Sequence, residues 1–188
     1  QIVLEDCDVP AGNRLGGEGQ GYRIALANLE TGRIGIAAQS VGMARSAFEA
    51  ALAYARERVA FGKPIAEQTV TLERIAESRI AIEQSRLLVL KAAYMMDTVG
   101  NKVAKKEIAM IKVVAPNVTC KVVDWAIQAY GGAGVHDEFL VGAYASARSL
   151  RLADGPDEVH RNSIAKMELR EMANGAATSG SAGATSSR

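Results

Sequence analysis

The sequence has few of the residues that metal centres, disulfide frameworks and membrane spans require. Its two cysteines, Cys7 and Cys120, lie in unrelated segments, so we expect a reducing compartment: the cytoplasm, or the mitochondrial or peroxisomal matrix of a eukaryote. Its two histidines, His136 and His160, lack a third ligand at metal spacing, so we predict no metal site. No apolar run has the roughly 20 residues of a membrane span. A formal net charge of +1 disfavours a general nucleic-acid binder.

The composition is that of a globular protein with a well-filled core, since 48% of the 188 residues are apolar and 23% are charged. Residues 1–22 are rich in glycine and predict an extended segment followed by a loop, with a strand at Ile2–Leu4. Because the chain begins with Gln1 inside that strand, we expect it to be part of a longer protein. Residues 175–188 are nearly all glycine, alanine, serine and threonine and predict a disordered tail.

Between these ends the sequence predicts helices. Apolar residues recur at steps of three and four in three long segments, as they do on one face of a helix. These segments run from about residue 33 to 59, from 69 to 98 and from 103 to 130. Shorter helices are expected at 139–150 and from Pro156 to about Met172, and Pro116 should kink the third long helix or remove one of its backbone bonds. Short connections between long helices predict an all-α, antiparallel up-and-down bundle.

Three stretches carry residues suited to chemistry. In Arg56–Ile65, followed by Gln68, Arg58 lies where the chain leaves a helix and is free to form a bidentate pair with phosphate. The glycines of Gln128–Gly134 allow the backbone to approach a ligand closely. In Arg151–Arg161, an aspartate precedes a Gly-Pro turn that opens a helix. Taken singly, each stretch also fits an ordinary helix end: a basic C-terminus, a glycine stop and an aspartate N-cap.

Together, in this order and spacing, the stretches resemble the acyl-CoA dehydrogenases. The resemblance covers about residues 1–172 and includes an entry motif at Asp8–Pro10 and Gly17–Tyr22. It implies that residues 1–22 are the end of a middle β-domain and its linker, that 23–174 form the C-terminal helical bundle, and that 175–188 are a tail.

The resemblance also implies a cofactor and an assembly. In this family FAD lies across a subunit boundary of a homodimer, usually within a homotetramer, so Arg58 would contact the pyrophosphate of the neighbouring subunit's FAD. Gln68 and the loop from Gln128 would hold its adenosine end, and Arg33 resembles an arginine near bound acyl-CoA. The cofactor-binding positions implied are Arg58, Phe61, Gln68, Gln128, Gly131, Gly132 and Glu158.

The reaction that the resemblance implies is α,β-dehydrogenation of an acyl-CoA thioester. A carboxylate removes the α-proton, the β-hydride goes to the flavin, and electron-transfer flavoprotein is the expected acceptor. Here the base is Asp154, because residues 76–170 closely resemble a branch with the motif Asp-Gly-Pro-Asp-Glu-Val-His. Another branch carries the base one residue before Arg33, where this chain has Gly32.

Two alternatives remain open. Acyl-CoA oxidases, flavin-dependent hydroxylases and nitroalkane oxidases share the fold, and the last of these also use an aspartate base. The chain could instead be a helical dimerisation module without a cofactor, which an intrachain carboxylate paired with Arg58 would favour. Since most of the middle domain and the N-terminal domain are missing, we expect the chain alone to be inactive.

Overall fold

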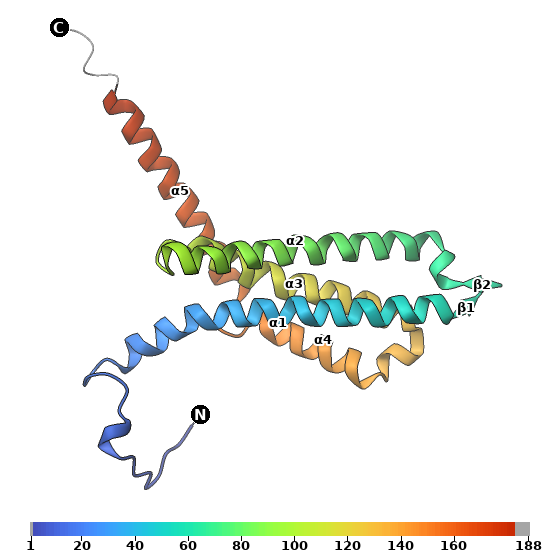
Figure 1. Ribbon diagram of the computed structural model, residues 1–188, viewed down its shortest axis with the longest axis horizontal. Coiled ribbons are helices and arrows are strands. Elements are labelled where there is room, and N and C mark those ends of the chain that lie inside the picture. The colour runs from blue at the N-terminus through green and yellow to red at the C-terminus, as the bar shows by residue number, and fades with distance from the viewer. Residues whose placement is uncertain (1, 183–188) are drawn as a thin grey trace.

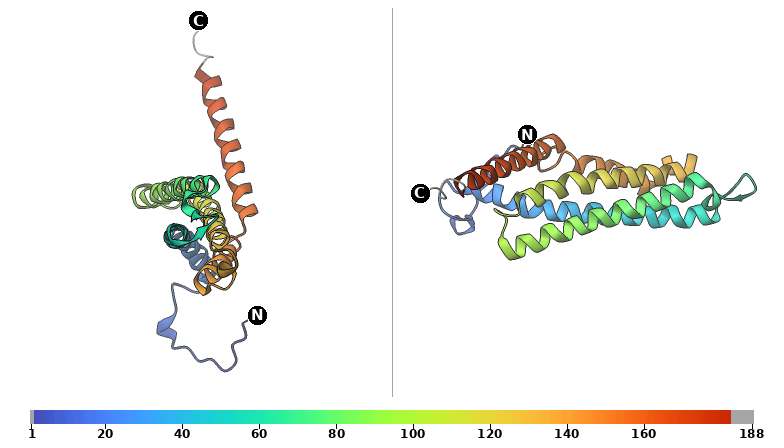
Figure 2. Two further views of the ribbon diagram at one scale, coloured as in Figure 1. Left: turned by 90° about the vertical axis from the view of Figure 1, so that its right-hand side faces the viewer. Right: turned by 90° about the horizontal axis from the view of Figure 1, so that it is seen from above.

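The computed structural model describes residues 2–182, with side chains described as far as residue 174. The elements are η1 (Ala11–Asn13), α1 (Gly21–Glu57), β1 (Val59–Ala60), β2 (Lys63–Pro64), η2 (Ile65–Glu67), α2 (Thr69–Val99), α3 (Lys105–Tyr130), η3 (Gly131–Val135), α4 (Glu138–Leu150) and α5 (Asp157–Ala182). Helices α1, α2, α3 and α4 run alternately up and down beside one another, and α5 leaves the bundle in the half opposite the hairpin β1–β2 (Figure 1 and Figure 2). The predicted all-α bundle is confirmed.

The first helix starts earlier than the sequence predicts. α1 begins at Gly21, close to the expected domain start at residue 23 but well before Arg33. The segment between these positions contains alanine, leucine, arginine and glutamate, which are strong helix formers. The strand predicted at Ile2–Leu4 is not formed: these residues have no partner strand within residues 2–182, and their side chains are exposed. That they belong to a β-domain stays a prediction.

α1 stops at Glu57, two residues before the predicted end near Val59, and a short hairpin follows. Strands β1 and β2 pair antiparallel, with Ala60 opposite Lys63. The two residues between them, Phe61 and Gly62, both have positive φ, 54° and 81°, as tight hairpin turns require. A phenylalanine is unusual in such a turn, so of the two residue types that normally mark a hairpin turn the sequence has only the glycine, Gly62.

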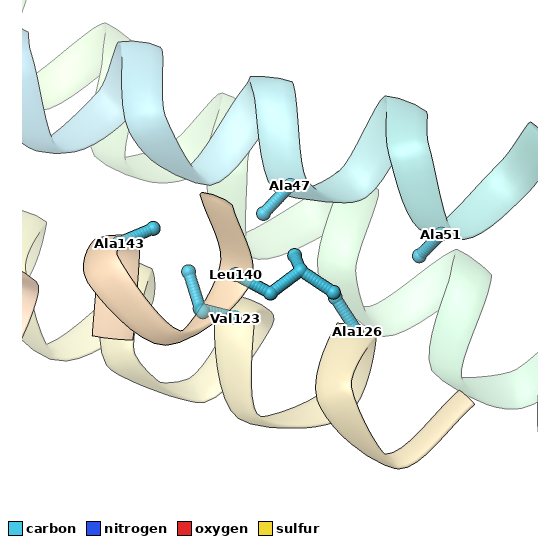
Figure 3. Close-up of a cluster of buried hydrophobic side chains, with 6 residues drawn as sticks. All are labelled: Ala47, Ala51, Val123, Ala126, Leu140 and Ala143. Carbon is cyan, nitrogen blue, oxygen red and sulfur yellow. The ribbon is translucent and has the colours of Figure 1, made fainter. Parts of the chain in front are cut away.

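The core is built largely from alanines that let helices approach closely. One cluster joins α1, α3 and α4, with Leu140 of α4 at its centre (Figure 3). Its buried members are Ala47, Ala51, Val123, Ala126, Leu140 and Ala143. Two further clusters join α1 and α3 to α2. Pro116 is buried within α3, and the helix continues through it as one element.

We expect Leu140→Ala to destabilise the chain by about 2–5 kcal/mol, because it opens a cavity among small side chains that cannot collapse to fill it. Urea denaturation of the chain measures this. Leu15→Ala is the matched control, since Leu15 is exposed and its truncation should cost no more than about 0.5 kcal/mol. Equal free energies of unfolding for the two variants would contradict the assigned core.

The segment at the C-terminal end is only partly described. α5 extends to Ala182, into the region where a disordered tail is predicted, while residues 183–188 lie outside the described residues. The tail therefore stays a prediction. Among the described residues, no helix is long and apolar enough to cross a bilayer.

Candidate functional site

Asp154 lies in the loop between α4 and α5, where two successive residues have positive φ. The angles are 55° for Asp154 and 105° for Gly155, and aspartate tolerates the left-handed region better than most residues. The Asp154 side chain is half-buried and rests on α1 at Gly32: a Cβ placed on Gly32 would lie 3.5 Å from Oδ2 of Asp154. The two positions at which the resemblance allows a base are therefore adjacent in space.

Arg33, the next residue of α1, contacts the same loop. Its Nη2 donates to the carbonyl oxygen of Asp154 over 3.2 Å, while its Nε is buried without a hydrogen-bond partner among the described residues. Arg33 also lines a polar cavity of about 180 Å³ together with Glu30, Lys105 and His160. The structure thus brings Arg33 and Asp154 together, and the role of Arg33 toward substrate stays a prediction.

His160 supports the loop from α5. It is only 5% exposed, and its Nε2 lies 3.3 Å from the carbonyl oxygen of Asp154. Because a carbonyl can only accept, Nε2 must carry the hydrogen. Burial, with a smaller effect from Arg33, lowers the pKa of His160 despite the opposing hydrogen bond to Asp154. The imidazole is therefore neutral at neutral pH.

This lowered pKa predicts a pH-dependent stability. An unfolded histidine titrates near pH 6.5, so the folded state binds fewer protons than the unfolded state below that pH. The contribution of neutral His160 to the free energy of unfolding is complete above pH 6.5 and is lost as pH falls through the lowered folded pKa. We expect the loss of unfolding free energy between about pH 7.5 and about pH 5.5 to be smaller in His160→Gln. His136→Gln, which alters an exposed imidazole, should leave the wild-type slope unchanged, and an identical slope in both variants would contradict the assignment.

Lys112 lies beneath the same loop, on α3. Its side chain is fully buried, and Nζ donates to the carbonyl oxygens of Leu150 at 2.7 Å and Gly155 at 3.3 Å. Lys112 was not among the residues predicted from the sequence. A signal was present, because Lys112 follows Ile108 by four residues and so falls on the buried face of the helix.

Asp157 anchors the first turn of α5. It is 2% exposed, and its Oδ2 accepts from Asn117 Nδ2 at 2.8 Å and Arg151 Nε at 2.9 Å. Burial raises the pKa of Asp157, but the bonds from Asn117 and Arg151 and the charge of Arg161 outweigh burial and hold the pKa below its usual value. Glu158, a predicted cofactor contact, has an exposed side chain that lies 4.0 Å from Arg161.

A second group of predicted residues meets at the other end of α1. Phe61, Gln68 and Gln128 line a groove of about 500 Å³, with Trp125 at its wall. Phe61 is 100% exposed, an unfavourable position for an aromatic ring that nothing covers. The groove is mainly apolar with two amide side chains, which suits a flat heterocycle with polar edges.

The end of α3 is fixed beside this groove. Tyr54 of α1 stacks on Tyr130 of α3 with ring centroids 4.1 Å apart. Gly131 follows with φ 63°, and both Gly131 and Gly132 are exposed but do not line the groove. The glycine turn thus lies next to the groove, close to Gln128, with which it is predicted to act.

Arg58 caps the end of α1 and is exposed. Among the described residues, no carboxylate lies within ion-pair distance of its guanidinium, in contrast to the pairs that Arg45 and Arg74 form with neighbouring glutamates. The observation that would have favoured a cofactor-free module is therefore not found. Arg58 is available to an anion outside the chain.

The two groups of residues are far apart. Arg33 and Arg58 are separated along α1 by about 37 Å at 1.5 Å per residue. The two groups therefore form separate sites within one chain.

Comparison with known proteins assigns this architecture. The family model for the acyl-CoA dehydrogenase C-terminal domain matches residues 19–169 of the sequence. The chain therefore belongs to the acyl-CoA dehydrogenase family. It is 54% identical over 174 residues to human acyl-CoA dehydrogenase family member 11, covering 92% of the chain and 22% of that relative. The chain therefore spans about a fifth of the length of this curated relative.

Solved structures agree with this assignment. Butyryl-CoA dehydrogenase from Megasphaera elsdenii superposes with a TM-score of 0.79 at 34% identity, over 89% of the chain and 43% of that protein. A glutaryl-CoA dehydrogenase from Mycobacterium smegmatis, solved in complex with FADH2, superposes with a TM-score of 0.74 at 25% identity, over 78% of the chain and 38% of that protein. The bundle is thus the fold of the C-terminal domain of these enzymes.

Proposed function

We propose that the complete protein carrying this chain is an FAD-dependent acyl-CoA dehydrogenase in which Asp154 removes the α-proton of the acyl thioester. The observation that carries the proposal is the placement of Asp154: its carboxylate rests over Gly32 of α1, on a loop held by Arg33 and His160. The cofactor supplies a hydride acceptor when bound. The chain's own residues supply the base and fix its position.

Each residue near Asp154 has a separate task in this proposal. Asp154 accepts the proton on a carboxylate oxygen, as a general base must, and holds it there. Gly32 lets the carboxylate lie against α1, because it has no side chain of its own. The neutral imidazole of His160 and the guanidinium of Arg33 both bind the backbone carbonyl of Asp154. The side chain of Asp154 is therefore left for substrate.

The other end of the bundle fits FAD. A mainly apolar groove with Gln68 and Gln128 suits an adenine, and the exposed guanidinium of Arg58 suits a pyrophosphate. The glutaryl-CoA dehydrogenase that shares this fold was solved in complex with FADH2. Because about 37 Å separates the two ends of α1, Arg58 of one subunit would serve the cofactor beside Asp154 of another. The proposal therefore requires at least a homodimer.

We expect Arg58→Ala in the complete protein to weaken FAD binding about 10- to 100-fold, the value of one charge-assisted hydrogen-bonding group. Equilibrium dialysis against free FAD measures the dissociation constant. Arg56→Ala is the matched control, because Arg56 is also exposed in the last turn of α1. Unchanged FAD affinity in Arg58→Ala would remove Arg58 from the cofactor site.

The reaction class is tested by the electron acceptor. Reoxidation of the reduced flavin by electron-transfer flavoprotein and not by oxygen supports a dehydrogenase. Rapid reoxidation by oxygen would make the protein an oxidase of the same fold. Turnover of nitroalkanes without turnover of acyl-CoA would make it a nitroalkane oxidase.

A further inference from the structure

We propose that Lys112 is a positioning residue for Asp154: its buried ammonium binds the carbonyl oxygens at both ends of the loop that carries the carboxylate. Nζ donates to Leu150, the last residue of α4, and to Gly155, the residue after Asp154. The effect on the reaction rests on the proposed function, whereas the effect on the loop does not.

Burial of the Lys112 ammonium is energetically unfavourable, so merely filling space does not account for this residue. A fully buried ammonium is strongly unfavourable unless its donors are bonded and countercharges lie near. Burial lowers the pKa of Lys112 and Arg33 adds to this effect, while Asp157 and Asp154 oppose it. An apolar side chain would fill the same space without that cost. The chain instead carries a cation whose hydrogen bonds go to two carbonyls of the loop.

The loop needs such support because of its backbone. Asp154 and Gly155 both have positive φ, and a residue other than glycine in this region is strained unless its surroundings hold it. Donors from three helices converge on the loop. Arg33 of α1 and His160 of α5 bind the carbonyl of Asp154. Lys112 of α3 binds the carbonyls of Leu150 and Gly155. Of these three donors, Lys112 alone reaches both ends of the loop, so it sets the path between them.

The test uses Lys112→Met in the complete holoenzyme, with Lys112→Arg as the conservative variant. We expect kcat for acyl-CoA to fall about 10- to 100-fold in Lys112→Met, because a base displaced by about 1 Å loses that much rate. KM and FAD content should stay within about twofold, and Lys112→Arg should recover part of kcat. Lys121→Met is the matched control: Lys121 is an exposed lysine of the same helix, and its variant should keep wild-type kcat.

Hydrogen exchange of the backbone amides of residues 151–157 is measured in the same proteins. We expect faster exchange in Lys112→Met than in wild type and in Lys121→Met. Wild-type kcat together with wild-type exchange would overturn the proposal. If wild type reduces no flavin with acyl-CoA, the proposed function fails, and the exchange rates alone decide the role of Lys112. Should Lys112→Met not fold, Lys112→Gln, which keeps an amide donor without the charge, is judged by the same criteria.

Discussion

Asp154→Asn should reduce the rate of flavin reduction by acyl-CoA by about 10²- to 10⁴-fold in the complete protein, the usual contribution of a general base. The amide keeps the size of the side chain and its place over Gly32, but it cannot take a proton at neutral pH. FAD content should not change, since Arg58, Gln68 and Gln128, which are proposed to bind FAD, lie at the other end of α1. Anaerobic stopped-flow absorbance of the flavin measures the rate.

Two further variants make this test specific. Asp154→Glu restores a carboxylate and extends it by about 1.5 Å, so it should retain more activity than the amide variant. Asp97→Asn, a change of an exposed aspartate on α2, should have wild-type activity. An Asp154→Asn enzyme with the wild-type rate would show that another group removes the proton.

Asp157→Ala should lower the free energy of unfolding of the chain by about 3 kcal/mol, because it removes a buried carboxylate from two half-buried partners. Asn117 of α3 and Arg151 at the end of α4 both donate to Oδ2 of Asp157, so the carboxylate joins three helices. Arg151 can turn partly to solvent, which keeps the loss at the lower end of the usual range for buried pairs. Urea denaturation at neutral pH measures the change.

Asp137→Ala is the control for this prediction. Asp137 caps α4 by accepting from the amide of Leu140 at 2.8 Å, and loss of a cap costs about 1 kcal/mol. The contribution of Asp157 should also depend on pH: it is complete above the unfolded value of 3.8 and is lost as pH falls through the lowered folded pKa. A stability loss in Asp157→Ala no larger than that in Asp137→Ala would contradict the buried network.

The helices of the bundle could be predicted because the period of their apolar residues follows the face of each helix that is buried. The same signal failed at residues 21–32, where α1 is largely exposed and propensity rather than burial keeps it helical. The hairpin was missed because Phe61 takes a conformation that sequence rules reserve for glycine and asparagine. A strand also needs a partner, and residues 2–4 have none within the described part of the chain, so the predicted strand did not form.

The sequence could predict part of the arrangement of the candidate residues, and their roles stay predictions. The proximity of Arg33 to Asp154, and of Phe61 to Gln68 and Gln128, agrees with the grouping that the resemblance implies. The residues that hold the loop were not found, since a buried lysine and a buried histidine differ from surface ones only in tertiary context. Distances across helices follow from packing, which a single sequence does not display.

The central claim is that the carboxylate of Asp154 abstracts a proton from the carbon next to a thioester. A crystal structure of the complete protein with FAD and a non-reactive acyl-CoA thioether tests this most directly. We expect an Asp154 carboxylate oxygen within about 3.5 Å of the α-carbon, on the side opposite the isoalloxazine. A carboxylate that faces bulk solvent, away from both flavin and acyl chain, would contradict the claim.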